Sequence, residues 1–399
     1  MQLLRASLLL TVLMLGACGT VKESVSNLVA RESDNSTPPA ELIEFEPSIE
    51  VEKIWSGRYG KGVDELFIQL LPAHYKDSIF TADRDGRTIA MDAATGKEIW
   101  TERDKALRIS GGPGAGEGLV YVGTSDAEVV ARDAETGEQK WVSNVSSEVL
   151  AAPVAARGTV VVRTGDGKLF GLHAESGKRK WVYDRTIPVL TLRGTGTPII
   201  HENTVIAGFD NGRLVALDLD TGKQEWETSL GVPSGRSDLE RMVDIDAEPT
   251  ILDGTAYIAS FQANVAAVSV FTGQLDWTRE ISSHSSLAAD EARVYVTDDK
   301  GYVWALDRRS GTSIWKQEGL KARKVTGPAV IGNYVVVGDF EGYLHWINSE
   351  TGEFVHRLRL DKQRILVPCR RVGEILLAFS TSGQLSAYKL AGPSGTDDE

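Results

Sequence analysis

The chain has 399 residues, of which 42% are hydrophobic, so it is long enough to bury an extensive core. Its 56 acidic residues outnumber its 43 lysines and arginines, and the formal net charge is −13. Because non-specific nucleic-acid binding and electrostatic docking on anionic lipid both need a basic surface, this balance argues against them. With only two cysteines, the composition also excludes a disulfide framework, an iron–sulfur cluster and a cysteine-rich zinc site.

Residues 1–17 have the features of a lipoprotein signal peptide. Arg5 precedes an apolar run that ends at Leu15 and is shorter than the about 20 apolar residues that span a bilayer. The letters LGAC, which end at Cys18, resemble the bacterial lipobox, in which the cysteine is acylated and becomes the first residue. Gly19 stands where an aspartate would resemble an inner-membrane retention signal, so the outer membrane is favoured. An ordinary signal peptide with a chance cysteine is the alternative.

The segments on either side of the expected folded part are polar. Residues 18–47 show no periodicity, which predicts that lipidated Cys18 is followed by a flexible tether. Residues 392–399 have a similar composition and are expected to form a disordered tail. The remaining cysteine, Cys369, lies in an apolar run and is interpreted as a small buried hydrophobe, with a reactive thiol as the alternative.

One unit is repeated eight times over residues 48–391. The pattern Thr/Ser-Gly-x-x-x-Trp recurs six times, and a seventh, degenerate copy ends at His356. The six tryptophans are Trp100, Trp141, Trp181, Trp226, Trp277 and Trp315. An eighth copy begins at Pro368 and stops before its tryptophan, whereas Trp55 has no repeat in front of it. A ring in which the N-terminal strand completes the last unit explains both observations.

Each unit is predicted to contain four short strands. In the third unit, the β-branched run 159–163 and the alternating run 168–173 are separated by a glycine turn, and a further strand covers 179–182. Asp-Gly and Asn-Gly pairs at equivalent turns favour tight hairpins, and a strand that begins at a proline, replaced by Leu287 in one unit, adds the fourth strand. No segment after residue 47 shows a helical period. The prediction is an all-β fold, an eight-bladed β-propeller of four-stranded antiparallel blades whose ring is closed by the N-terminal strand.

The run from Tyr121 to Trp141 resembles the pyrroloquinoline-quinone-like (PQQ-like) repeat. Quinoprotein alcohol dehydrogenases share this repeat, and the resemblance implies that such an enzyme needs a metal ion, an aspartate base and often a pair of adjacent cysteines. This chain has no adjacent cysteines, and aspartates such as Asp92 and Asp133 recur at one slot of the repeat, which indicates a turn cap. Its six histidines show no metal-ligand spacing. We therefore expect no catalytic residues, no metal and no cofactor, with a PQQ-dependent dehydrogenase as the alternative.

Two long connections between repeats are the clearest departures from the regular pattern. The segments from 181 to 198 and from 226 to 249 flank a single unit, and connections of this kind share one face of a propeller. Within them, residues 187–194 are apolar with one arginine and residues 233–246 are acidic, which favours a protein partner. The alternative for Leu190 and Leu192 is that they continue a strand into the core.

The lipobox, the tether, the eight PQQ-like units and the phrase Leu-Thr-Leu-Arg-Gly together resemble the BamB family of outer-membrane β-barrel assembly lipoproteins. The resemblance covers essentially the whole chain after Cys18. It implies a non-catalytic scaffold, lipid-anchored in the outer membrane and facing the periplasm. The implied partners are the POTRA domains of a BamA-like barrel subunit, other subunits of the complex and nascent outer-membrane proteins, and not nucleic acid. The implied partner-binding residues are Leu190, Leu192, Arg193, Asp244 and Asp246.

Asp244 and Asp246 have a second interpretation, in which they order their own loop through bonds to nearby backbone. A periplasmic ligand-binding propeller is the remaining alternative for the whole chain.

Overall fold

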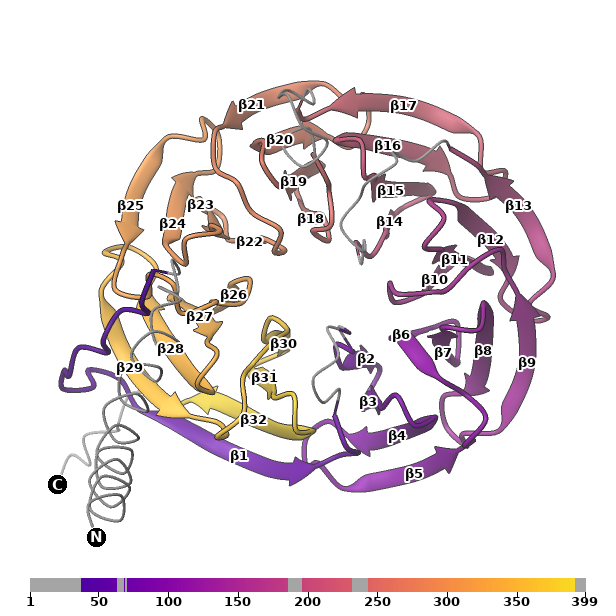
Figure 1. Ribbon diagram of the computed structural model, residues 1–399, viewed down its shortest axis with the longest axis horizontal. Helices are drawn as coiled ribbons and strands as arrows, with labels where there is room; N and C mark the ends of the chain where they lie inside the picture. Colours follow the sequence, from indigo (N-terminus) through magenta and orange to yellow (C-terminus); the bar gives the residue numbers. More distant parts are fainter. Residues whose placement is uncertain (1–36, 63–67, 69, 186–195, 232–242, 392–399) are drawn as a thin grey trace, which may run out of the picture. The chain divides into compact units, whose positions relative to one another are not determined.

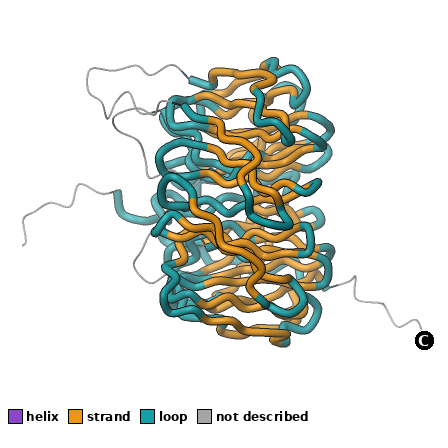
Figure 2. The backbone as a smooth tube through the Cα atoms, turned by 90° about the vertical axis from the view of Figure 1, so that its right-hand side faces the viewer, coloured by secondary structure: helices purple, strands orange, loops and turns teal. Residues whose placement is uncertain are grey.

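A ring of eight four-stranded antiparallel sheets surrounds a central opening in the computed structural model (Figure 1). The structure describes residues 37–62, 68, 70–185, 196–231 and 243–391. Within these ranges all regular structure is β, and none of the described segments is a helix long and apolar enough to cross a membrane. In the side view, loops gather along both edges of the layer of strands (Figure 2). The predicted eight-bladed propeller is confirmed.

The strands of each blade follow one another from the centre of the ring outward. The first blade contains β2 (Ala73–Tyr75), β3 (Ser78–Ala82), β4 (Arg87–Asp92) and β5 (Glu98–Arg103), and the second contains β6 (Ile109–Gly116), β7 (Leu119–Thr124), β8 (Glu128–Asp133) and β9 (Gln139–Asn144). The third contains β10 (Val154–Ala156), β11 (Thr159–Arg163), β12 (Leu169–His173) and β13 (Arg179–Tyr183), and the fourth contains β14 (Ile199–His201), β15 (Thr204–Gly208), β16 (Arg213–Asp218) and β17 (Gln224–Ser229). The fifth contains β18 (Thr250–Leu252), β19 (Thr255–Ala259), β20 (Val265–Ser269) and β21 (Leu275–Arg279), and the sixth contains β22 (Ala288–Ala289), β23 (Arg293–Thr297), β24 (Val303–Asp307) and β25 (Ser313–Gln317). The seventh contains β26 (Ala329–Ile331), β27 (Tyr334–Gly338), β28 (Tyr343–Asn348) and β29 (Phe354–Arg359).

The eighth blade joins the two ends of the folded chain. Its strands are β30 (Arg370–Val372), β31 (Ile375–Phe379), β32 (Gln384–Leu390) and, outermost, β1 (Val51–Arg58). β1 and β32 pair in antiparallel register from Val51 opposite Leu390 to Arg58 opposite Gln384. The ring therefore closes by hydrogen bonds between the N-terminal and C-terminal strands, as the unmatched Trp55 predicted.

The core lies between neighbouring blades, and the repeated tryptophans hold it together. Middle strands such as β11 and β16 are buried on both faces because β-branched and small residues fill them. On the outer strands the tryptophan points inward, and its Nε1–H donates to a backbone carbonyl of the next blade at 2.8–3.0 Å. These pairs are Trp55–Ala93, Trp100–Ala134, Trp141–Ala174, Trp181–Leu219, Trp226–Val270, Trp277–Arg308 and Trp315–Ser349. The recurring tryptophan is thus a joint between blades.

The recurring aspartates cap turns, as their repeat slot indicated. The Asp92 carboxylate accepts the Thr95 N–H at 2.8 Å, and Asp307 accepts the Ser310 N–H at 2.8 Å. Cys369 is buried and unpaired, and burial raises the pKa of its thiol to about 12. This environment keeps the thiol protonated, in agreement with its interpretation as a small core residue.

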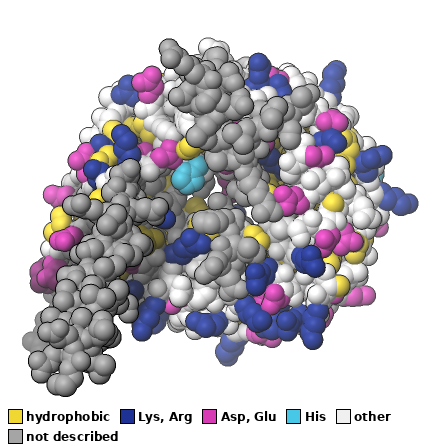
Figure 3. Space-filling view, viewed as in Figure 1, with side chains coloured by type: hydrophobic (Ala, Val, Ile, Leu, Met, Phe, Trp, Pro, Cys, Tyr) yellow, Lys and Arg dark blue, Asp and Glu magenta, His cyan; other side chains and the backbone are white. Residues whose placement is uncertain are grey.

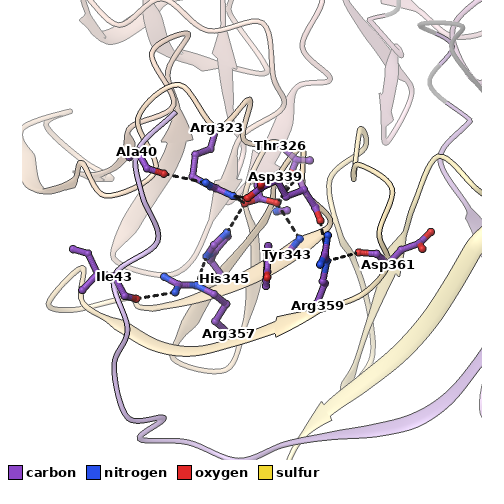
Figure 4. A network of polar contacts seen from close by, with 12 residues as sticks. Ala40, Ile43, Arg323, Thr326, Asp339, Tyr343, His345, Arg357, Arg359 and Asp361 are labelled. Atoms are coloured by element: carbon purple, nitrogen blue, oxygen red, sulfur yellow. Dashed lines mark hydrogen bonds and ion pairs between the residues drawn. The ribbon is translucent and has the colours of Figure 1, made fainter. Parts of the chain in front are cut away.

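Residues 40–47, which sequence analysis assigned to the flexible tether, pack against the ring; we call this segment the strap. The Ala40 N–H donates to the Lys321 carbonyl at 2.9 Å, and the Ala40 carbonyl accepts from Arg323 Nη1 at 2.9 Å. Arg357 Nη1 donates to the Ile43 carbonyl at 2.8 Å (Figure 4). Arg323, in the connection before the seventh blade, and Arg357, on β29, thus bind backbone carbonyls of a segment whose own sequence shows no periodicity.

Candidate partner-binding site

The two long connections that sequence analysis singled out flank the fourth blade. Leu190, Leu192 and Arg193 lie outside the described residues, whereas both ends of each connection are described. Where the connections rejoin the ring, a Cβ on Gly196 would lie only 3.0 Å from the Ile245 carbonyl oxygen and 3.2 Å from the carbonyl carbon of Asp246. The structure thus brings the end of one connection against the end of the other.

The second connection returns to the ring through a firmly seated segment, residues 243–246. Val243 forms a parallel bridge with Asn211, and the Ile245 N–H donates to the Phe209 carbonyl at 3.3 Å. The Ile245 side chain is fully buried, and it fits because position 208 is glycine, where a Cβ would lie 2.1 Å from Ile245 Cγ2.

The two predicted aspartates have different environments. Asp244 is fully buried, and its carbonyl accepts the Phe261 N–H at 2.8 Å. Asp246 is half-buried and lines a central cavity of about 1260 Å³. The two positions therefore differ: Asp246 lines the central cavity, whereas Asp244 is enclosed within the protein.

The start of the first connection is held by an ion pair. Arg185 binds Glu227 in a two-pronged arrangement, with Nη1–Oε2 and Nη2–Oε1 distances of 2.7 and 2.9 Å. Arg213 also contacts Glu227. Hydrogen bonding from Arg185, with a further contribution from Arg213, holds the pKa of Glu227 below its usual value. Bidentate pairs of this kind fix geometry as well as charge.

The central cavity carries charges of both signs. Innermost strands and the segments before them line it, including Glu248, Arg370 and the pair His284–Asp299, whose Nδ1–Oδ1 distance is 2.9 Å. Burial raises the pKa of Glu248, and the hydrogen bond that His284 donates to the Asp299 carboxylate raises the pKa of His284. Among the described residues no three His, Cys, Asp or Glu side chains are grouped to hold a metal ion. Acidic and basic side chains are also interspersed around the ring on the face seen in Figure 3.

Sequence analysis missed a buried ion pair beside these connections, Arg163–Asp210, with an Nη2–Oδ1 distance of 2.6 Å. Arg163 stands four residues before the turn glycine Gly167, at a slot where the other repeats carry uncharged residues. Comparing the repeats slot by slot would have singled out Arg163 as an unusual charge, although not its partner.

Comparisons with known proteins agree with one another. A family model described as outer membrane protein assembly factor BamB matches residues 84–317. Proteins named outer membrane protein assembly factor BamB are similar to this chain: that of Xanthomonas campestris pv. campestris is 39% identical over 94% of this chain and 95% of its own length. That of Pseudomonas aeruginosa is 43% identical over 90% of this chain and 94% of its own length.

Solved structures give the same fold. The crystal structure of BamB from Moraxella catarrhalis superposes with a TM-score of 0.78 at 28% identity, covering 85% of this chain and all of that one. A quinohemoprotein alcohol dehydrogenase from Pseudomonas putida superposes with a TM-score of 0.66 at 14% identity, covering 88% of this chain and 78% of that one. At that identity the second likeness shows a common propeller and nothing about chemistry.

Proposed function

Because this chain belongs to the family of the outer membrane protein assembly factor BamB, we propose that it is a non-catalytic scaffold lipoprotein in the machinery that assembles outer-membrane β-barrel proteins. The observation that carries the proposal is the convergence of the two long connections that flank the fourth blade, where Gly196 meets Ile245 and Asp246. Convergent loops on a rigid ring are a common way to build a binding surface. Quinone absorbance in the purified protein would contradict the non-catalytic part of the proposal.

The proposed partner is a BamA-like barrel subunit, bound through its POTRA domains. The apolar anchors would be Leu190 and Leu192, the cation Arg193 and the carboxylate Asp246. Ile245, beside Asp246, is buried in the ring. Apolar anchors with an arginine are typical of the few residues that dominate protein interfaces. Asp244 would contribute through the conformation of residues 243–246. Other subunits and nascent barrel proteins would be met on the same periplasmic side of the membrane.

Substitution of Arg193 by glutamate tests the surface. Arg193→Glu is expected to weaken binding to the POTRA segment by about 2–4 kcal/mol, because it reverses a charge that an interface arginine pairs bidentately. If Arg193 faces the partner, the melting temperature should change little, since surface substitutions usually alter stability by less than about 0.5 kcal/mol. Binding isotherms and thermal melts of the full mature chain provide both readouts.

Arg157→Glu is the matched control for that experiment. Arg157 is exposed in the turn between β10 and β11, at the end of the blade opposite to the connections between blades. Full binding by Arg193→Glu together with loss of binding by Arg157→Glu would move the interface to the other face.

Lipid anchoring is a further part of the proposal and rests on Cys18, which lies outside the described residues. Cys18→Ala is expected to leave an uncleaved, unacylated precursor, because the thiol that carries the lipid is gone. Mass spectrometry of the product from a Gram-negative host measures both modifications. Normal cleavage of Cys18→Ala to a soluble protein would identify an ordinary signal peptide instead.

A further inference from the structure

Arg163 is a charged residue at a repeat slot that the fold does not require to be charged. The slot is the last residue of the second strand, four residues before the turn. In the other repeats it holds Ala82, Gly123, Gly208, Ala259, Thr297, Gly338 and Phe379. The other seven blades therefore form with a small or apolar residue at this position. The fold alone does not explain why the third blade has an arginine there.

The guanidinium of Arg163 is buried and bridges two partners. Its side chain is 4% exposed, Nη2 contacts Asp210 Oδ1 at 2.6 Å and Nη1 donates to the Gly196 carbonyl at 3.1 Å. The guanidinium carbon also lies 5.7 Å from the centre of the Phe209 ring. Gly196 is where the first long connection rejoins the ring, so a side chain of the third blade fixes the end of that connection.

The same cluster reaches the second connection. Phe209, on which Arg163 stacks, accepts the Ile245 N–H through its carbonyl, and Asn211, next to Asp210, bridges Val243. Residues 209–211 thus touch Arg163 on one side and residues 243–245 on the other. Arg185, at the start of the first connection, also lies over the Phe209 ring, with its guanidinium carbon 5.9 Å from the ring centre.

A buried charge pair of this kind is costly to form and costly to break. Burial raises the pKa of Asp210 even though the Arg163 guanidinium acts in the opposite direction. Removing one partner leaves the other charge without compensation inside the protein. A neutral small residue would avoid this cost, and the other repeats show that the blade tolerates one.

We propose that Arg163 is a positioning residue for partner binding. It sets the distance between the two connections, because it links the Gly196 carbonyl to residues 209–211, which in turn contact residues 243–245. The inference rests on the proposed function, because it concerns the orientation of the same surface. Arg163 itself is buried and does not contact the partner.

The test compares two buried arginine–aspartate pairs. Arg163→Met removes the bridge, and Arg323→Met removes the equally buried Arg323–Asp339 pair in the seventh blade, away from the connections. We expect Arg163→Met to weaken affinity for the POTRA segment by about tenfold or more, and Arg323→Met to leave it within about twofold, at a temperature where both are folded. Amide hydrogen exchange should accelerate at residues 196–197 and 243–246 in Arg163→Met only.

Gly196→Ala provides a second variant that keeps the buried charges. A Cβ at this position would lie 2.7 Å from Arg163 Nη1 and 3.0 Å from the Ile245 carbonyl, so it pushes the two connections apart. It should weaken binding as Arg163→Met does, and it remains informative if Arg163→Met does not fold. Arg163→Lys, which keeps the charge but cannot span both acceptors, should fall between Arg163→Met and the wild type.

The outcomes separate the inference from the function on which it rests. A wild-type chain that does not bind the POTRA segment contradicts the proposed function. Wild-type binding with unchanged affinity in Gly196→Ala and in folded Arg163→Met overturns the positioning role. Equal losses in Arg163→Met and Arg323→Met also overturn it, because they would reflect general destabilisation.

Discussion

At the scale of single residues, the glycine of each Thr/Ser-Gly-x-x-x-Trp motif serves the blade before its own. Gly177 has a φ of +68°, and a Cβ there would lie 2.5 Å from Cε3 of Trp141. Gly177→Ala is therefore expected to lower the free energy of unfolding by about 2–4 kcal/mol, because steric overlap with a buried indole adds to left-handed strain. Equilibrium denaturation measures the loss.

A second glycine separates the two contributions. Gly158 has a φ of +75°, but nothing lies within 4 Å of a Cβ placed there. Gly158→Ala should therefore cost only the backbone strain of about 1–2 kcal/mol. If Gly177→Ala and Gly158→Ala lower the free energy of unfolding equally, the Trp141 indole can move aside without destabilising the protein, contrary to its role as a joint between blades.

The buried His345 makes stability depend on pH. Arg357 Nε donates to its Nδ1 at 3.0 Å, so its Nε2 carries the proton that Asp339 accepts at 3.1 Å (Figure 4). Burial lowers the pKa of His345 below the value near 6.5 of an unfolded chain. As the pH falls below about 6.5, the unfolded chain takes up a proton that the folded chain refuses, and stability declines by up to about 1.4 kcal/mol per pH unit from this group.

Substitution isolates this contribution from those of the other histidines. The unfolding free energy of His345→Gln should fall less steeply than that of the wild type between pH 7.5 and 5.5. His173→Gln, at an exposed position, is the control and should keep the wild-type slope. Parallel slopes for wild type and His345→Gln would contradict a neutral buried ring.

At the scale of elements, the strap and β1 contribute to stability by different means. Phe45 of the strap stacks on Phe354 with ring centres 5.9 Å apart, and Arg357 lies over the Phe45 ring. Deleting residues 20–36 should leave the melting temperature unchanged, whereas deleting 20–47 should cost about 1–3 kcal/mol of buried apolar surface. Deleting 20–58 should cost about 4 kcal/mol or more in addition, because Trp55 is lost and the edge of β32 is left unpaired.

Thermal and chemical denaturation of these three truncated chains gives the comparison. If the chains lacking 20–58 and 20–47 have the same melting temperature, β1 does not close the ring in solution. A chain without 20–47 that melts with the chain lacking 20–36 would show that the strap is not docked.

At the scale of the whole molecule, the ring was predictable from the sequence because its determinants are local and repeated. The determinants are the turn glycines, capping aspartates such as Asp92 and the recurring tryptophan. They act within one unit or between neighbouring units, so every copy of the sequence pattern predicts the same blade structure. The unmatched Trp55 even revealed the closure. The strap was not predictable, because its docking depends on Arg323 and Arg357, which lie 283 and 314 residues further along the chain than the residues they bind.

The candidate site was predictable only in part, for the same physical reason. Unequal connection lengths pointed to the connections that flank the fourth blade, and in the structure Gly196 and residues 245–246, at the ends of these connections, lie close together. The pattern Asp-x-Asp could not show that Asp244 is buried while Asp246 lines a cavity. Nor could it reveal the pairing of Arg163 with Asp210, since this contact joins two different repeats.

The closure of the ring by β1 also sets the order in which the molecule can be completed. Ser56 and Ser386, whose hydroxyls lie 2.8 Å apart, are 330 residues apart in the chain. Synthesis produces β1 first and its partner β32 last, and contacts this distant in sequence form slowly. Until the final hairpin arrives, β1 and Trp55 stay uncovered, and an uncovered strand edge invites pairing with other chains. A chain that stops before β32 is therefore expected to aggregate rather than to form a seven-bladed ring.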